Sequence, residues 1–144
     1  MISIDIYSHK TETNGDLNAL EVAEFLHEHL DEYGDEKSSI QKAIEHALSK
    51  NGRVVLAKDE TKLVGGVVIN KTGMSDYIPE NILVYIAIHG NYRGKGIGKR
   101  LMNASLENLE GDVALHVEKD NPAKFLYESL GFTNPYLEMR LKRN

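Results

Sequence analysis

The stretch Ile82-Leu-Val-Tyr-Ile-Ala-Ile88 is followed by His89-Gly-Asn-Tyr92, by Arg93-Gly-Lys-Gly-Ile-Gly98 and by Lys99-Arg-Leu-Met102. Its first seven residues are apolar, too few to span a bilayer but the right number for a buried strand. Glycines then occupy every second position from 94 to 98, and the residues after them have the apolar spacing of a helix. The stretch therefore predicts a strand, a glycine loop and a helix in direct succession.

A glycine loop between a strand and a helix points several backbone N–H groups at one spot in front of the helix N-terminus. Such a spot binds anions, and phosphate above all. Glycine suits the loop because a side chain would hold the phosphate away and would disfavour a positive φ. The cations of the same stretch are Arg93, Lys95, Lys99 and Arg100. These features predict a phosphate-binding loop.

Two other glycine motifs for phosphate do not fit this loop. A Walker loop ends in Gly-Lys followed by Ser or Thr, whereas Lys99 is followed by Arg100. The dinucleotide fingerprint is G-x-G-x-x-G, whereas residues 94–98 read G-x-G-x-G and no second dinucleotide half follows. The alternative without function is a glycine-rich turn that lets a strand enter a helix.

The residues around the loop resemble those of a known family, the GNAT superfamily of N-acetyltransferases. Arg93, Gly96 and Gly98 match its R/Q-x-x-G-x-G/A motif, which follows a central strand. A second block, Asn121-Pro-Ala-Lys-Phe-Leu-Tyr-Glu-Ser-Leu-Gly-Phe132, resembles the family's segment that runs from an asparagine through Leu-Tyr-Glu to Gly-Phe. The two blocks stand in the family's order and spacing, and the resemblance covers residues 82–132.

The first half of the chain predicts a strand, two helices and a hairpin. Residues 2–6 alternate between isoleucine and polar residues, as in a strand. A first helix is expected from an N-cap at Asp16 to about Glu32, and a second from a capping box of Ser38 and Gln41 to the Asn51-Gly52 pair. The residues expected to point inward are Leu20, Ala23, Leu26 and Leu30 in the first helix, and Ile40, Ala43, Ile44, Ala47 and Leu48 in the second. Residues 53–58 and 63–70 flank a turn and read as the hairpin.

Further elements are expected on either side of the glycine loop. Residues 71–80 read as a loop and residues 113–117 as a short strand. A helix should follow, with Asn121 as its N-cap, Pro122 in its first position and Gly131 beyond its end. Residues 136–141 read as a last strand. With the resemblance, these elements predict an α/β fold: a single GNAT-like domain over residues 1–144, with a mixed, mostly antiparallel sheet flanked by helices.

Composition narrows the class of protein. A chain of 144 residues should bury roughly 68–70% of its unfolded surface and needs no disulfide. It contains no cysteine, which excludes a thiol nucleophile and suits a reducing compartment. A net charge of −5 disfavours nonspecific nucleic-acid binding. The first residues lack the pattern of a signal peptide and no segment reads as membrane-spanning, so we expect a cytoplasmic protein.

The resemblance implies transfer of an acetyl group from acetyl-CoA to an amine. In the family the cofactor pyrophosphate lies on the loop amides, and the pantetheine arm pairs with the edge of the central strand. An asparagine at the position of Asn121 contacts the cofactor, although Asn121 serves equally well as a helix N-cap. The cofactor-binding residues carried over are Ile86, Ala87, Ile88, Arg93, Gly94, Lys95, Gly96, Ile97, Gly98, Lys99, Asn121 and Lys124.

The resemblance also assigns the general acid, whereas the general base is open. Tyr127 follows the leucine of Leu-Tyr-Glu, and a phenol of pKa about 10 can protonate a departing thiolate at neutral pH. The alternative for Tyr127 is a core residue. The protein-lysine branch of the family has a catalytic glutamate where this chain has Ile82. Glu80 is the first candidate base, with a plain surface carboxylate as its alternative, and the further candidates are Asp76, His116 and Glu118.

No metal site is expected, because His27 and His29 face different ways on a helix and His9, His46 and His89 are isolated. Three functions remain open. The first is acetylation of a small amine or polyamine, favoured by the acidic first half of the chain, and the second is acetylation of protein N-termini or lysines. The third is acyl-CoA binding without catalysis. The chain is expected to be a monomer or a homodimer that binds acetyl-CoA and an amine, with cationic amines among the candidate acceptors.

Overall fold

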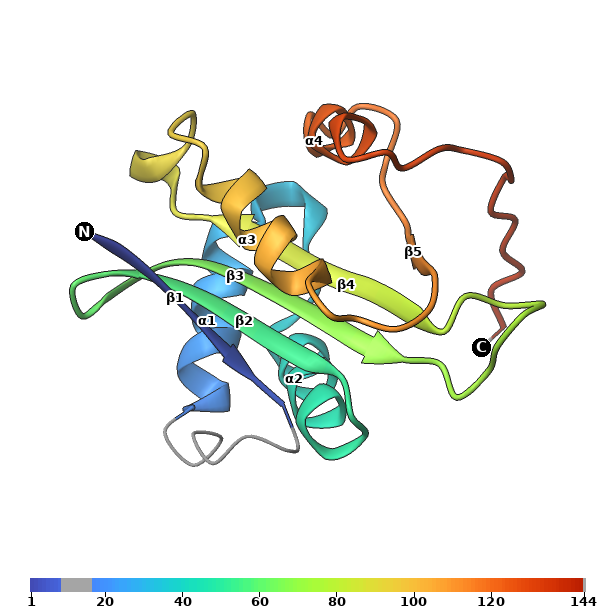
Figure 1. Ribbon diagram of the computed structural model, residues 1–144, viewed down its shortest axis with the longest axis horizontal. Helices are drawn as coiled ribbons and strands as arrows, with labels where there is room; N and C mark the ends of the chain where they lie inside the picture. The colour runs from blue at the N-terminus through green and yellow to red at the C-terminus, as the bar shows by residue number, and fades with distance from the viewer. Residues whose placement is uncertain (9–16, 144) are drawn as a thin grey trace.

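The computed structural model describes residues 1–8 and 17–143 of the chain. Its centre is a five-stranded sheet in the order β1-β2-β3-β4-β5 (Figure 1). The strands are β1 (Ile2–Tyr7), β2 (Arg53–Asp59), β3 (Lys62–Lys71), β4 (Asn81–Ile88) and β5 (Val113–Leu115). Successive strands pair antiparallel except β4 and β5, which are parallel. The prediction of a mixed, mostly antiparallel sheet is confirmed.

Helices cover both faces of this sheet (Figure 1). They are α1 (Ala19–His29), α2 (Lys37–Ser49), α3 (Ile97–Leu106) and α4 (Ala123–Ser129), with short 3-10 turns η2 (Asp31–Tyr33) and η3 (Gly90–Tyr92). Helices α1 and α2 pack on one face together with Tyr7, Val54, Leu56 and Val68. Helix α3 packs on the other face together with Val55, Ala57, Val67 and Ile69. No helix among the described residues is long and apolar enough to cross a membrane.

Helix α1 begins later than predicted. Its N-cap is Asn18, whose side chain accepts the Glu21 N–H at 3.1 Å, and the predicted cap Asp16 lies outside the described residues. Leu20 was wrongly expected to point inward; it is 51% exposed, and Val22 is buried instead. The helix ends at His29, short of Glu32, and Asp31 adopts a positive φ of 55° just beyond it.

Helix α2 has the predicted apolar face but not the predicted cap. Ile40, Ile44 and Ala47 are fully buried. The N-cap is Glu36, which makes no side-chain capping bond, so the capping box at Ser38 is wrong. The predicted stop is confirmed: Asn51 adopts a φ of 65°, and the Gly52 N–H donates to the Ala47 carbonyl at 2.8 Å.

The hairpin of β2 and β3 and the loop before β4 are confirmed, but the last predicted strand is wrong. Residues 136–141 form no strand in the part of the chain that the structure describes. Their apolar side chains are 81–91% exposed, namely Tyr136, Leu137, Met139 and Leu141. Strand β5 is also shorter than residues 113–117, so it offers little edge for another strand to join.

Strands β4 and β5 pair only at their beginnings. The paired residues are Asn81 with Val113, Ile82 with Ala114 and Leu83 with Leu115. Beyond Leu83 the rest of β4, residues 84–88, has β3 on one side, and on the side of β5 no strand of the described residues pairs with it. The sheet therefore opens between these two strands, on the way to the glycine loop.

Candidate active site

The glycine loop leaves open space in front of α3. Gly94 and Gly96 have φ of 78° and 80°, in the left-handed region that favours glycine, and Gly96 is the N-cap of α3. A Cβ added at either residue would meet no heavy atom within 4 Å. Ile97 by contrast is buried and anchors the first turn of the helix in the core. The loop thus presents its backbone outward and can hold an anion.

All four cations of the loop stretch are exposed, and three of them, Lys95, Lys99 and Arg100, lie at the surface away from helix α1. Lys95 lies over the ring of Tyr92, with Nζ 5.3 Å from the ring centroid. Lys99 is exposed, and so is Arg100, whose guanidinium also donates to the Ile2 carbonyl at 3.4 Å. These charges can contribute to the attraction of phosphate groups.

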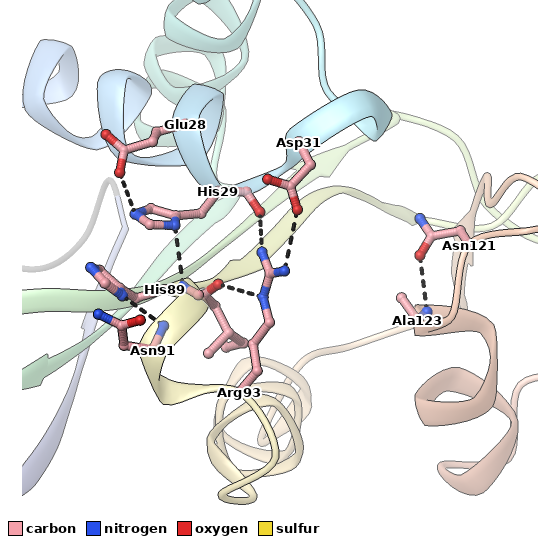
Figure 2. A network of polar contacts seen from close by, with 10 residues as sticks. Glu28, His29, Asp31, His89, Asn91, Arg93, Asn121 and Ala123 are labelled. Atoms are coloured by element: carbon pink, nitrogen blue, oxygen red, sulfur yellow. Dashed lines mark hydrogen bonds and ion pairs between the residues drawn. The ribbon is translucent and has the colours of Figure 1, made fainter.

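Arg93 faces helix α1 with its side chain (Figure 2). Its Nε donates to the Ile88 carbonyl at 3.1 Å, and Nη2 donates to the His29 carbonyl at 2.7 Å. Its Nη1 forms an ion pair with Asp31 at 3.2 Å. The Arg93 guanidinium therefore ties the end of β4 to the end of α1, a contact that the motif did not predict.

The part of β4 that does not pair with β5 lies beside these contacts of Arg93. Tyr85 and Ala87 are buried against the α1 and α2 face, whereas Ile86 and Ile88 pack on the α3 side. The Tyr85 hydroxyl donates to Asp35 at 2.5 Å. The predicted pantetheine-binding residues, 86–88, thus lie at the end of β4 next to the glycine loop.

Tyr127 lies in α4 and is only 7% exposed. Burial, followed by the negative charge of Glu118, raises the pKa of Tyr127 to about 12. Its ring packs against Phe132 and belongs to the same apolar cluster as Leu83 and Ile97. Its hydroxyl donates a hydrogen bond to no acceptor among the described residues. The phenol therefore remains protonated and has its proton available.

Asn121 contacts the start of the helix that carries Tyr127. Its Oδ1 accepts the N–H of Ala123 at 2.9 Å, at some distance from the Arg93 contacts (Figure 2). Lys124, also predicted to bind cofactor, is exposed in the first turn of α4. The N-cap position of α4 is Pro122, one residue later than the predicted Asn121, although the Asn121 side chain still bonds to the start of the helix. Gly131 lies just beyond the helix end as predicted, with a φ of 98°.

Glu80 is set apart from these residues. It precedes β4, at the end of the strand opposite to the glycine loop, and its Oε1 accepts the Asp112 N–H at 3.1 Å. A Cβ added at Gly111 would lie 2.5 Å from the Glu80 carboxyl carbon, so the two segments pack tightly. The general-base role of Glu80 stays a prediction, and this contact favours a structural role.

The connection between α1 and α2 contributes contacts that sequence reasoning missed. Tyr33 donates to the Asp120 carbonyl at 3.2 Å, Asp35 accepts from Tyr85, and Asp31 pairs with Arg93. The acidic residues were noticed in the sequence, but their partners lie at least 50 positions away, too far for a local pattern to indicate. The acidic residues of this region are Glu28, Asp31, Glu32, Asp35 and Glu36.

His29 and His89, which the sequence reading treated separately, lie together. Their ring centroids are 4.3 Å apart. Within residues 1–8 and 17–143, no three His, Asp or Glu side chains are grouped so as to hold a metal ion.

Comparison with known proteins supports the family assignment. Residues 50–134, more than half of the chain, match the model of the acetyltransferase (GNAT) domain. No curated protein matches the chain.

Solved structures share the fold over nearly the whole chain. A GNAT-family acetyltransferase from Streptococcus pneumoniae TIGR4 superposes with a TM-score of 0.73 and 22% identity, over 100% of both chains. A ribosomal-protein-alanine N-acetyltransferase from Brucella melitensis biovar Abortus 2308 gives 0.65 and 16%, over 99% of this chain and 100% of the other. An aminoglycoside acetyltransferase from an uncultured soil metagenomic sample gives 0.63 and 21%, over 99% and 95%. The chain therefore belongs to the GNAT family of acetyltransferases.

Proposed function

We propose that this chain transfers the acetyl group of acetyl-CoA to a primary amine of a small molecule or polyamine, with Tyr127 as general acid. The observation that carries the proposal is the open space at Gly94 and Gly96, which adjoins the unpaired edge of β4. An anion-binding loop beside a free strand edge suits a ligand with a phosphate end and an amide-containing arm.

The residues present fit coenzyme A. The loop amides of residues 94–99 would hold its pyrophosphate, with Lys95 and Lys99 supplying exposed positive charge. The β4 edge at residues 86–88 would align the pantetheine arm, and Asn121 and Lys124 would flank it. Arg93 acts indirectly in this arrangement, because its guanidinium already binds the Ile88 and His29 carbonyls and Asp31.

Tyr127 would supply a proton to the departing sulfur. The acetyl group reaches the enzyme as a thioester, so its transfer leaves a thiolate that must be protonated or hydrogen-bonded. A pKa of about 12 keeps the Tyr127 phenol protonated at neutral pH, and its hydroxyl donates to no other group among the described residues. Positioned general acids contribute about 10²–10⁴-fold to rate.

The acidic residues at the end of α1 favour a cationic acceptor. The exposed carboxylates at the end of α1 and just beyond it are those of Glu28, Asp31 and Glu32. They lie near the contact between Arg93 and Asp31. A surface of one sign attracts ligands of the opposite sign. One similar structure is an aminoglycoside acetyltransferase, which supports a small polyamine-like acceptor.

A protein acceptor is the second candidate. It is supported by the likeness to the ribosomal-protein-alanine N-acetyltransferase and by the exposure of the same carboxylates, which a basic peptide can reach. Release of free CoA thiol is measured with diamines, aminoglycosides and basic peptides as acceptors. The result distinguishes a small-amine acceptor from a protein acceptor.

Binding of CoA tests the proposal directly. Gly96→Asp places a carboxylate in the open space and should weaken CoA binding severely in calorimetry. Gly73→Asp is the matched control, because Gly73 has a φ of 79° and equally open surroundings but lies in the β3–β4 loop. Both variants place aspartate at a positive φ and so carry similar backbone strain, but only Gly96→Asp places a carboxylate in the glycine loop. Only Gly96→Asp should therefore lose CoA binding. Equal binding by both would contradict a phosphate site at the loop, and a chain that binds CoA but acetylates no amine would be the acyl-CoA-binding module.

A further inference from the structure

We propose that His29 and His89 are positioning residues that hold the glycine loop in its binding conformation only while both imidazoles are neutral. This inference rests on the proposed function, because it takes residues 93–99 as the CoA-binding loop. It assigns the two histidines a role that neither acetyl transfer nor the loop motif requires.

The two imidazoles belong to a row of rings that runs from α1 to the residue before the loop. The His29 ring lies 4.7 Å from Phe25 and 4.3 Å from His89, and the His89 ring meets Tyr92 edge-on at 5.5 Å. Tyr92 directly precedes Arg93. The row therefore connects the end of α1 to the start of the glycine loop.

Each imidazole accepts a backbone N–H of the turn that leads into the loop (Figure 2). Gly90 donates to Nδ1 of His29 at 3.3 Å, and Asn91 donates to Nδ1 of His89 at 3.1 Å. A nitrogen accepts only through a lone pair, so neither Nδ1 carries a proton. On His29 the proton is then on Nε2, which lies 3.0 Å from a carboxylate oxygen of Glu28.

The surroundings oppose a positive charge on His29. Its side chain is only 12% exposed, and burial lowers its pKa, with a further contribution from His89. Glu28 and Asp31 raise this pKa, and Arg93 lowers it. Beyond His89, the charged groups at Tyr92 are Lys62 and Lys95 over its ring and the Asp59 carboxylate, which accepts from the Tyr92 hydroxyl at 2.8 Å. Two imidazolium ions at this separation would also repel each other.

Protonation would convert each accepting nitrogen into a donor that faces another N–H. The turn η3 would then lose its bonds to both rings and shift, and the loop that follows it would shift with it. Simple attraction between a protonated imidazole and a phosphate predicts the opposite effect on binding. Whether CoA binding weakens or strengthens as the pH falls therefore distinguishes loss of the loop conformation from simple charge attraction.

The test is calorimetry of CoA on the full chain from about pH 8 down to about pH 5.5, the range in which histidine titrates. The test variant is His29→Asn/His89→Asn, since an asparagine oxygen can take the place of Nδ1 but does not titrate. Wild type should lose about tenfold in affinity more than this variant over the range, the size of one hydrogen bond. Phosphate titration of CoA itself is common to all proteins and cancels in the comparison.

Two further variants separate positioning from stability. His29→Ala/His89→Ala should bind CoA weakly at every pH, and the Asn variant should restore binding at pH 8. His46→Asn, on the exposed side of α2, should keep the wild-type profile. Absence of CoA binding by wild type at pH 8 would contradict the proposed function. Binding with the same pH slope in wild type and in the Asn variant, or binding that strengthens at low pH, would overturn this inference alone.

Discussion

The hydroxyl of Tyr33 donates a hydrogen bond to the carbonyl oxygen of Asp120 at 3.2 Å, although the two residues are 87 positions apart. Tyr33 lies in the connection between α1 and α2, and Asp120 precedes Asn121, whose side chain accepts the first N–H of the helix that carries Tyr127. The same connection contacts Arg93 through Asp31 and Tyr85 through Asp35. One short segment is therefore bonded to the glycine loop, to β4 and to the approach to α4.

Tyr33→Phe should raise KM for the acceptor amine while CoA affinity stays close to that of wild type. The change removes only the bond between the acidic connection and the α4 side, and leaves Asp31 and Arg93 in contact. The melting temperature should change little because the bond is exposed. Tyr77→Phe, at a side chain that is 78% exposed in the β3–β4 loop, is the control. Unchanged acceptor kinetics in Tyr33→Phe would mean that the bond has no part in acceptor binding.

Tyr127→Phe should lower turnover by about 10²–10⁴-fold with little change in the dissociation constant for CoA. The missing group acts on the leaving thiolate and not on the bound cofactor. Because its pKa is raised to about 12, Tyr127 stays protonated as pH rises from 7 to 9, so its ionisation should not limit turnover there. Tyr136→Phe, on an 85% exposed side chain, is the control. Turnover within about twofold of wild type would make Tyr127 a core residue only.

Glu80→Gln tests the candidate base. The amide oxygen of glutamine can still accept the Asp112 N–H, so the fold should be retained and turnover should stay close to that of wild type. Glu80→Ala removes the acceptor and should cost about 1 kcal/mol of stability in chemical unfolding. A large loss of turnover in Glu80→Gln at an unchanged melting temperature would instead establish the predicted general base.

The acidic residues predict a salt-dependent preference for cationic amines. The triple variant Glu28→Gln, Asp31→Asn, Glu32→Gln should raise KM for a diamine or basic peptide with little change in turnover, and should weaken the rise of KM with salt. A matched control neutralises three exposed carboxylates elsewhere: Glu45, Glu107 and Glu110. An anionic best substrate, or kinetics indifferent to salt, would show that the residues near α1 are only a solvated surface.

Patterns that act within a few residues predicted most of the fold. The spacing of Ile40, Ile44 and Ala47 indicated the buried face of α2, and the glycines at 94 and 96 indicated the loop conformation before α3. Helix starts were less predictable, because several polar residues near the start of α1 can cap, and the structure uses Asn18. Residues 136–141 show the converse error: alternation indicates a strand, but a strand also needs a neighbour.

The candidate site was predictable as a set of residues but not as a set of contacts. Arg93 was identified from its motif, yet its partners are a carbonyl of α1 and a carboxylate beyond it. His29 and His89 are far apart in sequence and meet only because α1 packs beside the end of β4. Such pairings depend on how helices and strands pack against one another. Residue spacing within a single helix or strand carries no information about that packing.

The exposed segment at residues 136–141 has a consequence for the behaviour of concentrated solutions. Leu137, Met139 and Leu141 alternate with charged residues, and β1, a six-residue strand, stands at the edge of the sheet and pairs only with β2 among the described strands. An alternating segment and a sheet edge can join between molecules as well as within one. Charges at Glu138, Arg140 and Lys142 act as gatekeepers against such stacking. Colloidal stability should therefore fall as salt screens these charges, even where the folded domain itself is unaffected.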